Sequence, residues 1–506
     1  MSDTGVRLDS DVRRVPVLAG SRIALVPVGD DDVVLAPPPP PEQVADVPAS
    51  VRDALRFPLS GPTLEQAAPA GGRATIVVEH PALPYPEPQL DPRPQALAAA
   101  IDELERCGIR DERVTILVAG GLERRSGQRE LERLLPPPRA RSFRGRVLTH
   151  DAEHPELVPL VSAASLNRAL VETDLVLTVG AAETVLHGGP GTLLAACDSA
   201  TLRAVAGAES LVEAGGAPEW RRALEVEEAL GRVVPVVGVS LVLDLPRLTG
   251  TYRGYPHDPE TVKHAARSPF RRVFGRLPGF LRRDVLERQA RRVAVIAAFG
   301  GSPSVAHAEA LLRGVDLRGL RLDDPVDALV VGAPWMGQHL PRERANPVSA
   351  ASSALGLALR LYRNAFPIRE NGTVVVVHPL ARSFEHGAGD PYSVMFNALR
   401  TARDGNEVDV AEASAGTDAR SLDAYRAGEA CHPLLPYADW AGCGPALSRI
   451  GRVVVAGCRD AIAARTLGFV PSHGIGSALE MAHGVAGGKA RIGVLLAPPY
   501  APILVG

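Results

Sequence analysis

Residues Asp174–Ala196 read DLVLTVGAAETVLHGGPGTLLAA, and their order indicates how this part of the chain folds. The run Leu175–Val179 is unbroken and apolar, which is typical of a strand buried on both faces. The turn Gly188-Gly189-Pro190-Gly191 follows, and an apolar segment comes after it. A buried strand that runs through a turn into a helix is the repeating unit of an α/β protein.

Apolar runs of the same kind recur on both sides of this stretch. Before it lie Ala74–Val78 and Val114–Val118, with a helical pattern over Pro94–Cys107 between them and another over Ser162–Leu170. Beyond the Arg-, Pro- and Gly-rich segment 245–291 a second series begins, at Val293–Ala297, Ala328–Val331, Thr373–Val377, Val453–Ala456 and Ile492–Leu496.

This alternation predicts an α/β fold with two α/β domains, mostly parallel sheets and an interdomain cleft. We expect one domain over residues 1–292 and a second over residues 293–497, with residues 498–506 packing back on the first. The segment Ala351–Phe366 is predicted to be helical.

Composition narrows the class of protein. The net charge of −3 gives no electrostatic reason to expect nucleic acid or an anionic membrane as a partner. The most basic stretch, Arg267–Arg292, has two interpretations, a solvated amphipathic face or a basic binding patch. The five widely spaced cysteines indicate a reducing compartment, and no apolar run is long enough to span a bilayer. We therefore expect a cytoplasmic protein.

Several motifs lie in one order along nearly the whole chain. They are Arg73–Pro86 (RATIVVEHPALPYP), Val114–Arg124 (VTILVAGGLER), Thr149-His150-Asp151, Ala298–His307 (AFGGSPSVAH) and Ser477–Leu496. Together with Asp174–Ala196, they make the chain resemble the nickel-dependent lactate racemases. The resemblance implies a two-domain fold, a small 2-hydroxy acid or related carboxylate as substrate, and a nickel-pincer nucleotide tethered to a lysine.

The chain departs from that family where the cofactor would be held. The tethering lysine falls on or beside Ala195, and the only two lysines, Lys263 and Lys489, lie far from it in the sequence. A shuttle histidine falls on Glu123 and a second on Val185. Arginine cannot replace a nucleophilic lysine, because its guanidinium stays protonated. The sequence therefore predicts no tethered pincer nucleotide and no metal site.

Candidate catalytic groups remain near the ends of the predicted strands. Glu183 and His187, four residues apart, are either an acid–base pair or a solvated pair. His150 is either an imidazole oriented by a carboxylate or part of a local turn. Glu123 and Arg124 are either substrate-binding groups or members of a charged loop. The Gly188–Gly191 turn is either an anion-binding nest or a tight turn before a helix.

Three further substrate-binding candidates lie in the second half. His378 follows a predicted strand, His386 lies in the loop beyond it, and Arg344 falls roughly where the family has a lysine. A loop of scattered polar residues is the alternative interpretation of the two histidines. Two functions follow, an isomerase or racemase acting on a small 2-hydroxy acid or related carboxylate, and a catalytically inactive ligand-binding or regulatory protein. The sequence does not choose between them.

Overall fold

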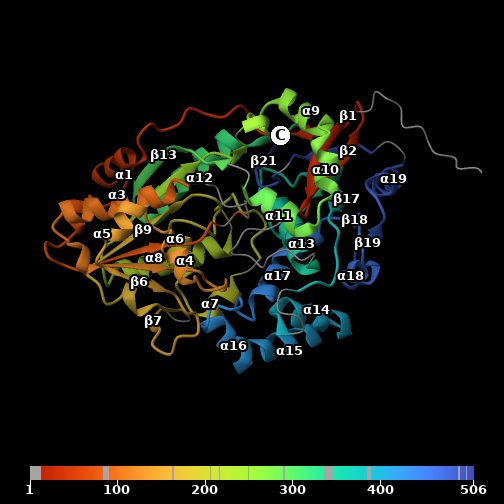
Figure 1. Cartoon of the computed structure of the whole chain (residues 1–506). Helices are drawn as coiled ribbons and strands as arrows, with labels where there is room; N and C mark the ends of the chain where they lie inside the picture. Colours follow the sequence, from red (N-terminus) through yellow and green to blue (C-terminus); the bar gives the residue numbers. More distant parts are fainter. Residues whose placement is uncertain are drawn as a thin grey trace, which may run out of the picture.

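The computed structural model describes residues 13–81, 83, 91–161, 164–205, 207–215, 217–248, 250–288, 291–334, 346–384, 389–487, 490–496 and 498–506. Two six-stranded sheets organise it, each covered by helices (Figure 1). Both are mostly parallel, so the predicted α/β fold is confirmed.

The first sheet carries the strands that the sequence predicted most directly. Its order is β13 (Val295–Gly301), β10 (Val236–Leu243), β9 (Leu175–Ala181), β4 (Ala74–Val78), β5 (Val114–Val118) and β6 (Arg146–Thr149). All neighbours are parallel except β10 and β13. The strand β9 is buried along its whole length, as its unbroken apolar run requires. Helices of this half include α1 (Val47–Arg56), α3 (Arg93–Arg106), α8 (Pro218–Gly231) and α12 (Pro303–Arg318).

The second sheet is parallel throughout. Its order is β19 (Val470–Ser472), β18 (Arg452–Ala456), β17 (Ile368–Val377), β15 (Val326–Gly332), β20 (Ile492–Leu495) and β3 (Val33–Leu35). The hairpin of β1 (Arg13–Ala19) and β2 (Arg22–Val28) packs on this sheet, so in Figure 1 the earliest strands lie beside the latest ones. The helices that follow β17 include α14 (Pro391–Thr401), α15 (Gly405–Gly416), α16 (Ala419–Arg426), α17 (Leu435–Leu447), α18 (Ala461–Thr466) and α19 (Ile475–Val485).

Two connections complete the architecture. A small sheet of β14 (Leu320–Leu322), β21 (Ile503–Val505) and β16 (Tyr362–Arg363) holds the C-terminal strand. The segment between β10 and β13 folds into α9 (Pro259–Arg267), α10 (Phe270–Arg276) and α11 (Gly279–Arg288).

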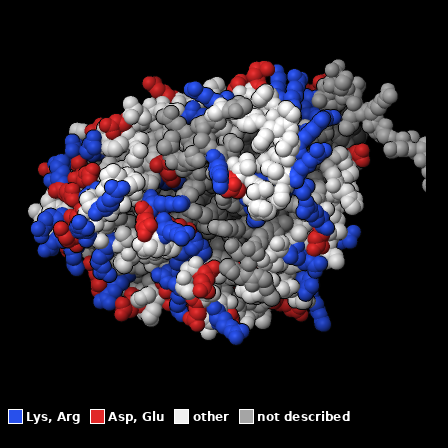
Figure 2. All heavy atoms as spheres, in the orientation of Figure 1, with Lys and Arg blue, Asp and Glu red and all other residues white. Residues whose placement is uncertain are grey.

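On the face shown in Figure 2, acidic and basic side chains are interspersed, and basic ones gather along the edge where Figure 1 places α9 and α10.

Some assignments of segments to sheets and helices were wrong. The strand predicted at Val293–Ala297 exists as β13, but it pairs antiparallel with β10 in the first sheet. The strand β3 joins the second sheet although it precedes the first one in sequence. The strand partners of β21 lie in residues 320–363, and the packing of residues 498–506 on the first 292 residues stays a prediction. Strand pairing depends on distant segments, which a local pattern does not contain. The division into residues 1–292 and 293–497 stays a prediction.

Two helix predictions also failed. Ser162 and Ala163 lie outside the described residues, and Ala164–Leu166 forms a short strand, β8, that pairs with β7 (Val158–Val161). Ala351–Phe366 is only partly helical: a π-helical segment, Ser352–Leu357, leads into a single 3-10 turn, Ala358–Arg360. At Gly356 a Cβ would lie 3.4 Å from Ser352 Oγ and 3.5 Å from Asp439 O and from Gly442 C, so α17 packs directly against this segment.

Candidate functional site

A cavity of about 270 Å³ lies where the carboxyl ends of first-sheet strands meet elements from the second half of the chain. Glu79 follows β4, Glu123 follows β5 and His187 follows β9, and all three line it. The opposite lining comes from the π-helical segment with its 3-10 turn, which supplies Arg360, and from α17, which supplies Asp439. Parallel sheets gather ligand-binding loops at this edge. The cavity is therefore the best-placed candidate site.

Three carboxyl groups in this cavity have raised pKa values. Burial, together with the nearby charge of Asp439, raises the pKa of Glu123 to about 8. Burial raises the pKa of Asp439 to about 6, although Tyr392 Oη donates a hydrogen bond of 2.6 Å to its Oδ2. Burial and the charge of Glu183 raise the pKa of Glu79 well above its ordinary value. At neutral pH the cavity thus holds a protonated Glu123 and an ionised Asp439, an arrangement suited to acid–base chemistry.

The positive charge in the cavity wall belongs to Arg360, whose residue is only 5% exposed. Its Nη1 donates to Gly356 O at 3.2 Å and Gly442 O at 3.4 Å. Among the described residues, its buried Nε and Nη2 have no hydrogen-bond partner. Guanidinium N–H groups form paired hydrogen bonds with carboxylates. Arg360 therefore keeps unused hydrogen-bonding capacity of the kind that suits a carboxylate.

His187 is the imidazole in this cavity wall that lies closest to the glycine-rich turn. Its Nδ1 lies 2.8 Å from Thr184 Oγ1. Burial, with the nearby groups of His307 and Arg360, lowers the pKa of His187 to about 4. The ring is therefore neutral at physiological pH and can exchange hydrogen bonds without carrying charge.

The glycine-rich turn is shaped by close packing. Gly188 and Gly189 have φ values of +101° and +54°, which favour glycine. A Cβ at Gly188 would lie 2.5 Å from Ala181 O and from the His307 ring, and one at Gly189 would lie 2.3 Å from His307. His307 itself is anchored by a 2.9 Å hydrogen bond between its Nε2 and Thr184 O. The turn fixes the start of α6 (Pro190–Leu194) against α12, which carries His307.

Of the predicted first-half residues, Glu123 and His187 line the cavity, and three others lie outside its lining. Glu183 is buried, with its Oε1 at 3.6 Å from Arg93 Nη1. His150 is buried, its Nε2 lies 2.8 Å from Cys197 O, and burial lowers its pKa to about 4. Arg124 pairs with Glu130 and donates to Gly428 O at 3.3 Å. These three side chains are held by contacts within the protein.

Of the predicted second-half residues, His378 lies within the described part of the chain, and it does not line this cavity. Arg344 and His386 lie outside the described residues. His378 is 1% exposed, and its Nδ1 accepts from Leu380 N at 3.2 Å. The imidazole of His378 therefore lies inside the loop that follows β17.

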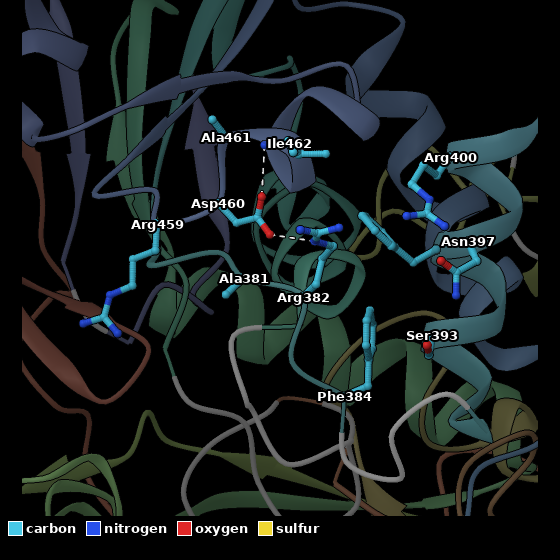
Figure 3. Close-up of a pocket in the computed structure, with 11 residues that line it drawn as sticks. Ala381, Arg382, Phe384, Ser393, Asn397, Arg400, Arg459, Asp460, Ala461 and Ile462 are labelled. Carbon is cyan, nitrogen blue, oxygen red and sulfur yellow. Dashed lines mark hydrogen bonds and ion pairs between the residues drawn. The ribbon is translucent and has the colours of Figure 1, made fainter.

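An open hollow beyond β17 and β18 offers a different environment (Figure 3). Arg382 and Asp460 face each other there, with Nε and Oδ2 2.7 Å apart. The other oxygen of Asp460 accepts from Ile462 N at the start of α18. Arg382 and Arg459 are exposed. Among the described lining residues the one carboxylate, Asp460, is already bonded, so they offer none of the buried acid–base groups of the first cavity.

Sequence reasoning did not propose Arg360, Asp439 or Glu79 as site residues. Glu79 carried a signal, because it directly follows a buried strand. Asp439 lies within α17, and Arg360 ends an irregular helical segment. Neither position is marked by a local motif, since its place in the site depends on how the second half packs against the first sheet.

The residues present do not fit a tethered nickel-pincer nucleotide. Ala195, on or beside the tethering position, lines the cavity with a methyl group. Within the described ranges, no group of three or more His, Cys, Asp and Glu side chains could hold a metal ion. Nickel needs imidazole or soft ligands at fixed geometry. The described lining of the cavity thus offers neither the amine nor the ligand set.

The fold and cavity define a class, an α/β protein with a buried acid–base cavity at the carboxyl edge of a parallel sheet. Residues 20–189 match the family model of the lactate racemase N-terminal domain. The lactate racemase apoprotein of Thermoanaerobacterium thermosaccharolyticum shares the fold, with a TM-score of 0.60 and 13% identity over 97% of this chain and 100% of that one. Residues 20–189 therefore resemble the lactate racemase N-terminal domain, as the motifs predicted, and the whole chain shares the fold of a lactate racemase.

Two other comparisons add little. A protein of Thermotoga maritima aligns over 91% of this chain and 98% of its own, at 12% identity and a TM-score of 0.49, which is too distant to interpret. No curated protein sequence matches this chain. Among the described residues, no helix is both long and apolar enough to cross a membrane.

Proposed function

We propose that this chain is an isomerase of racemase type that acts on a small 2-hydroxy acid or related carboxylate without a tethered cofactor. The observation that carries the proposal is Arg360, a buried guanidinium with two unpartnered nitrogens among the described residues, in a cavity that also holds Glu123 and Asp439. A carboxylate bound to Arg360 places its neighbouring carbon among groups that can give and take protons. The lactate racemase-like fold supports the same substrate class.

The proton transfers follow from the ionisation states. Asp439, with a pKa of about 6, is ionised at neutral pH and takes the proton from the carbon next to the carboxylate. The electron pair moves into the carboxylate held by Arg360. Glu123, with a pKa of about 8, then gives its proton to the other face of that carbon. One proton leaves and one arrives, so the product differs from the substrate only in configuration, and the next turnover runs in the opposite direction.

Two further groups assist by binding. Burial raises the pKa of Glu79 well above its ordinary value, which favours the protonated form that can donate a hydrogen bond to oxygen atoms of the substrate. His187 is neutral and remains available to the substrate hydroxyl group. Hydrogen-bond donors fixed in a dry cavity stabilise negative charge as it develops.

A second function is a ligand-binding or regulatory protein without catalysis. It is favoured by Glu123 and Val185, which stand where the lactate racemases have shuttle histidines, and by Ala195 at the tethering position. Such a protein keeps the carboxylate site of Arg360 and performs no proton transfer.

Proton exchange distinguishes the two functions. Enantiopure 2-hydroxy acids are incubated with the protein in D2O, and loss of the proton on the second carbon is followed by NMR. We expect exchange with the unaltered chain and with the surface control Asp409→Asn, and none with Asp439→Asn. Carboxylate binding without exchange, over a panel of such acids, would establish the ligand-binding function instead.

A further inference from the structure

The candidate cavity has a mostly apolar wall. Its lining includes five leucines from different parts of the chain, namely Leu186, Leu194, Leu202, Leu357 and Leu435. Leu194 is buried, whereas the other four keep part of their surface accessible. They pack on two hydrophobic clusters that lie behind the wall. This wall offers a ligand apolar contact and no hydrogen bonds.

The cavity is larger than a small acid bound to its polar groups would fill. At roughly 30 Å³ of liquid for each water molecule, 270 Å³ corresponds to about nine waters. A substrate as small as lactate would occupy part of this space and leave leucine side chains facing water. Apolar surface left in water contributes nothing to affinity, whereas each buried methylene contributes about 0.8 kcal/mol, or roughly a fourfold change in Kd.

We infer that the natural ligand is a 2-hydroxy acid or related carboxylate with a branched aliphatic or aromatic side chain. The inference rests on the proposed function only for the carboxylate end, which binds Arg360. The side chain of the ligand occupies the leucine wall. The site thus selects for an apolar substituent larger than the methyl group of lactate.

Two alanines in the cavity lining leave space beside the leucines. Ala195 follows the last residue of α6, and Ala438 lies on α17, one residue before Asp439. Both line the cavity and are half-buried, so each leaves space that a longer side chain would fill. Gly121 N donates to Ala195 O at 3.1 Å through the backbone, a contact that a change of side chain does not remove. Ala195 and Ala438 are therefore the residues that set the size of the ligand.

The test measures binding of lactate and of 2-hydroxy-4-methylpentanoate to the whole chain by isothermal titration calorimetry. The longer acid has three more carbon atoms, so we expect its Kd to be roughly 30- to 60-fold lower. Ala438→Leu and Ala195→Leu should weaken the longer acid at least tenfold and leave lactate within about twofold. Ala413→Leu, which adds the same bulk at an exposed position of α15, should change neither.

The outcomes separate this inference from the proposed function. Equal affinities for the two acids, or a loss of both in Ala438→Leu and Ala195→Leu, would overturn the apolar selection. Tight binding of the longer acid without proton exchange would contradict the proposed isomerase activity but support the inferred class of ligand. Failure of both acids to bind would overturn the carboxylate site and the inference together.

Discussion

At the residue scale, the proposed proton transfer depends on two carboxyl groups whose pKa values differ. Glu123 and Asp439 reach the cavity from different halves of the chain, and the charge of Asp439 is one cause of the raised pKa of Glu123. Because one group is protonated and the other ionised only between their pKa values, the rate of proton exchange should be bell-shaped. We expect half-maximal rates near pH 6 and pH 8, measured as kcat/KM across pH 5 to 9.

The direction in which the rate changes on each side of the pH optimum identifies the residue that titrates there. The rate falls as pH drops through about 6, since Asp439 gains a proton, and falls as pH rises through about 8, since Glu123 loses one. Glu123→Gln should abolish proton exchange, while Asp409→Asn should leave the bell-shaped pH profile unchanged on both sides. A profile that rises steadily to pH 9 would exclude Glu123 as the acid.

Arg360 gives the second prediction at this scale. Arg360→Met removes the guanidinium that binds the carboxylate, so we expect the affinity for 2-hydroxy acids to fall roughly 10- to 100-fold. Thermal stability should not fall, because a buried charge with unpartnered nitrogens is replaced by an apolar side chain of similar length. Arg363→Met, on a surface ion pair with Asp316, is the control and should leave binding unchanged. Unaltered affinity in Arg360→Met would contradict the carboxylate site.

The contrast between residues that the sequence identified and those it missed has a physical basis. Glu123 and His187 follow buried strands, and strand ends can be read from an apolar run. His150 and Glu183 follow strands as well, yet they are held by Cys197 and Arg93, which local patterns do not show. Arg360 enters the site through an irregular helical segment, whose position is set by packing against α17.

At the scale of elements, contacts between α16–α17 and the loops after β5 and β6 join the two halves beside the cavity. Tyr425 Oη accepts from Ala152 N at 3.1 Å and lies 3.2 Å from Gly121 O, and His432 N donates to Leu122 O at 2.9 Å. His432 Nε2 also lies 3.2 Å from Glu153 Oε1. These bonds hold the loop that carries Glu123 against the second half.

Removal of one hydroxyl tests this junction. Tyr425→Phe leaves two buried backbone groups without their partner, so we expect it to lower the free energy of unfolding by about 1–2 kcal/mol in urea titrations. Tyr437→Phe is the matched control, because the buried hydroxyl of Tyr437 has no hydrogen-bond partner among the described residues. Its removal should be neutral or slightly stabilising. Equal losses in the two variants would show that the Tyr425 hydroxyl does not join the halves.

The strand order shows which parts of the fold could be predicted from the sequence at this scale. The runs Ala74–Val78 and Val114–Val118 coincide with β4 and β5, because β-branched residues bounded by turn residues form buried strands. The pairing of β3 with β20 and of β13 with β10 joins segments far apart in the chain or reverses direction. No local pattern encodes those partners, so the two-sheet fold was predictable and the membership of its edge strands was not.

At the scale of the whole molecule, the chain has a lactate racemase-like fold, whereas its described residues do not fit the tethered nickel-pincer nucleotide. Co-expression with the enzymes that make the pincer nucleotide should yield protein with no covalent adduct and no stoichiometric nickel, because Ala195 has no amine to form the tether. Intact-mass spectrometry and elemental analysis provide the measurement. A mass increase equal to the nucleotide, or about one nickel per chain, would refute this expectation.

The buried ionisable groups also determine how global stability depends on pH. Glu123 has a folded pKa of about 8 against 4.5 when unfolded, so its contribution to stability is complete below pH 4.5 and is lost as pH rises through 8. His150, His187 and His307 have folded pKa values of about 4 against 6.5, so their contribution is present above pH 6.5 and is lost as pH falls through 4. The two effects oppose each other between about pH 4.5 and 6.5.

Above pH 6.5 the histidines no longer contribute a slope, and the raised pKa of Glu123 acts in the same direction as that of Glu79. We therefore expect the free energy of unfolding to fall between pH 7 and pH 8 in urea titrations. Glu123→Gln should reduce this slope by about 1 kcal/mol per pH unit, because one fewer proton is released on unfolding. Glu480→Gln, on the exposed face of α19, should keep the full slope. A slope that is unchanged in Glu123→Gln would mean that Glu123 is ionised in the folded protein at neutral pH, and the acid of the proposed proton transfer would then have to be Glu79.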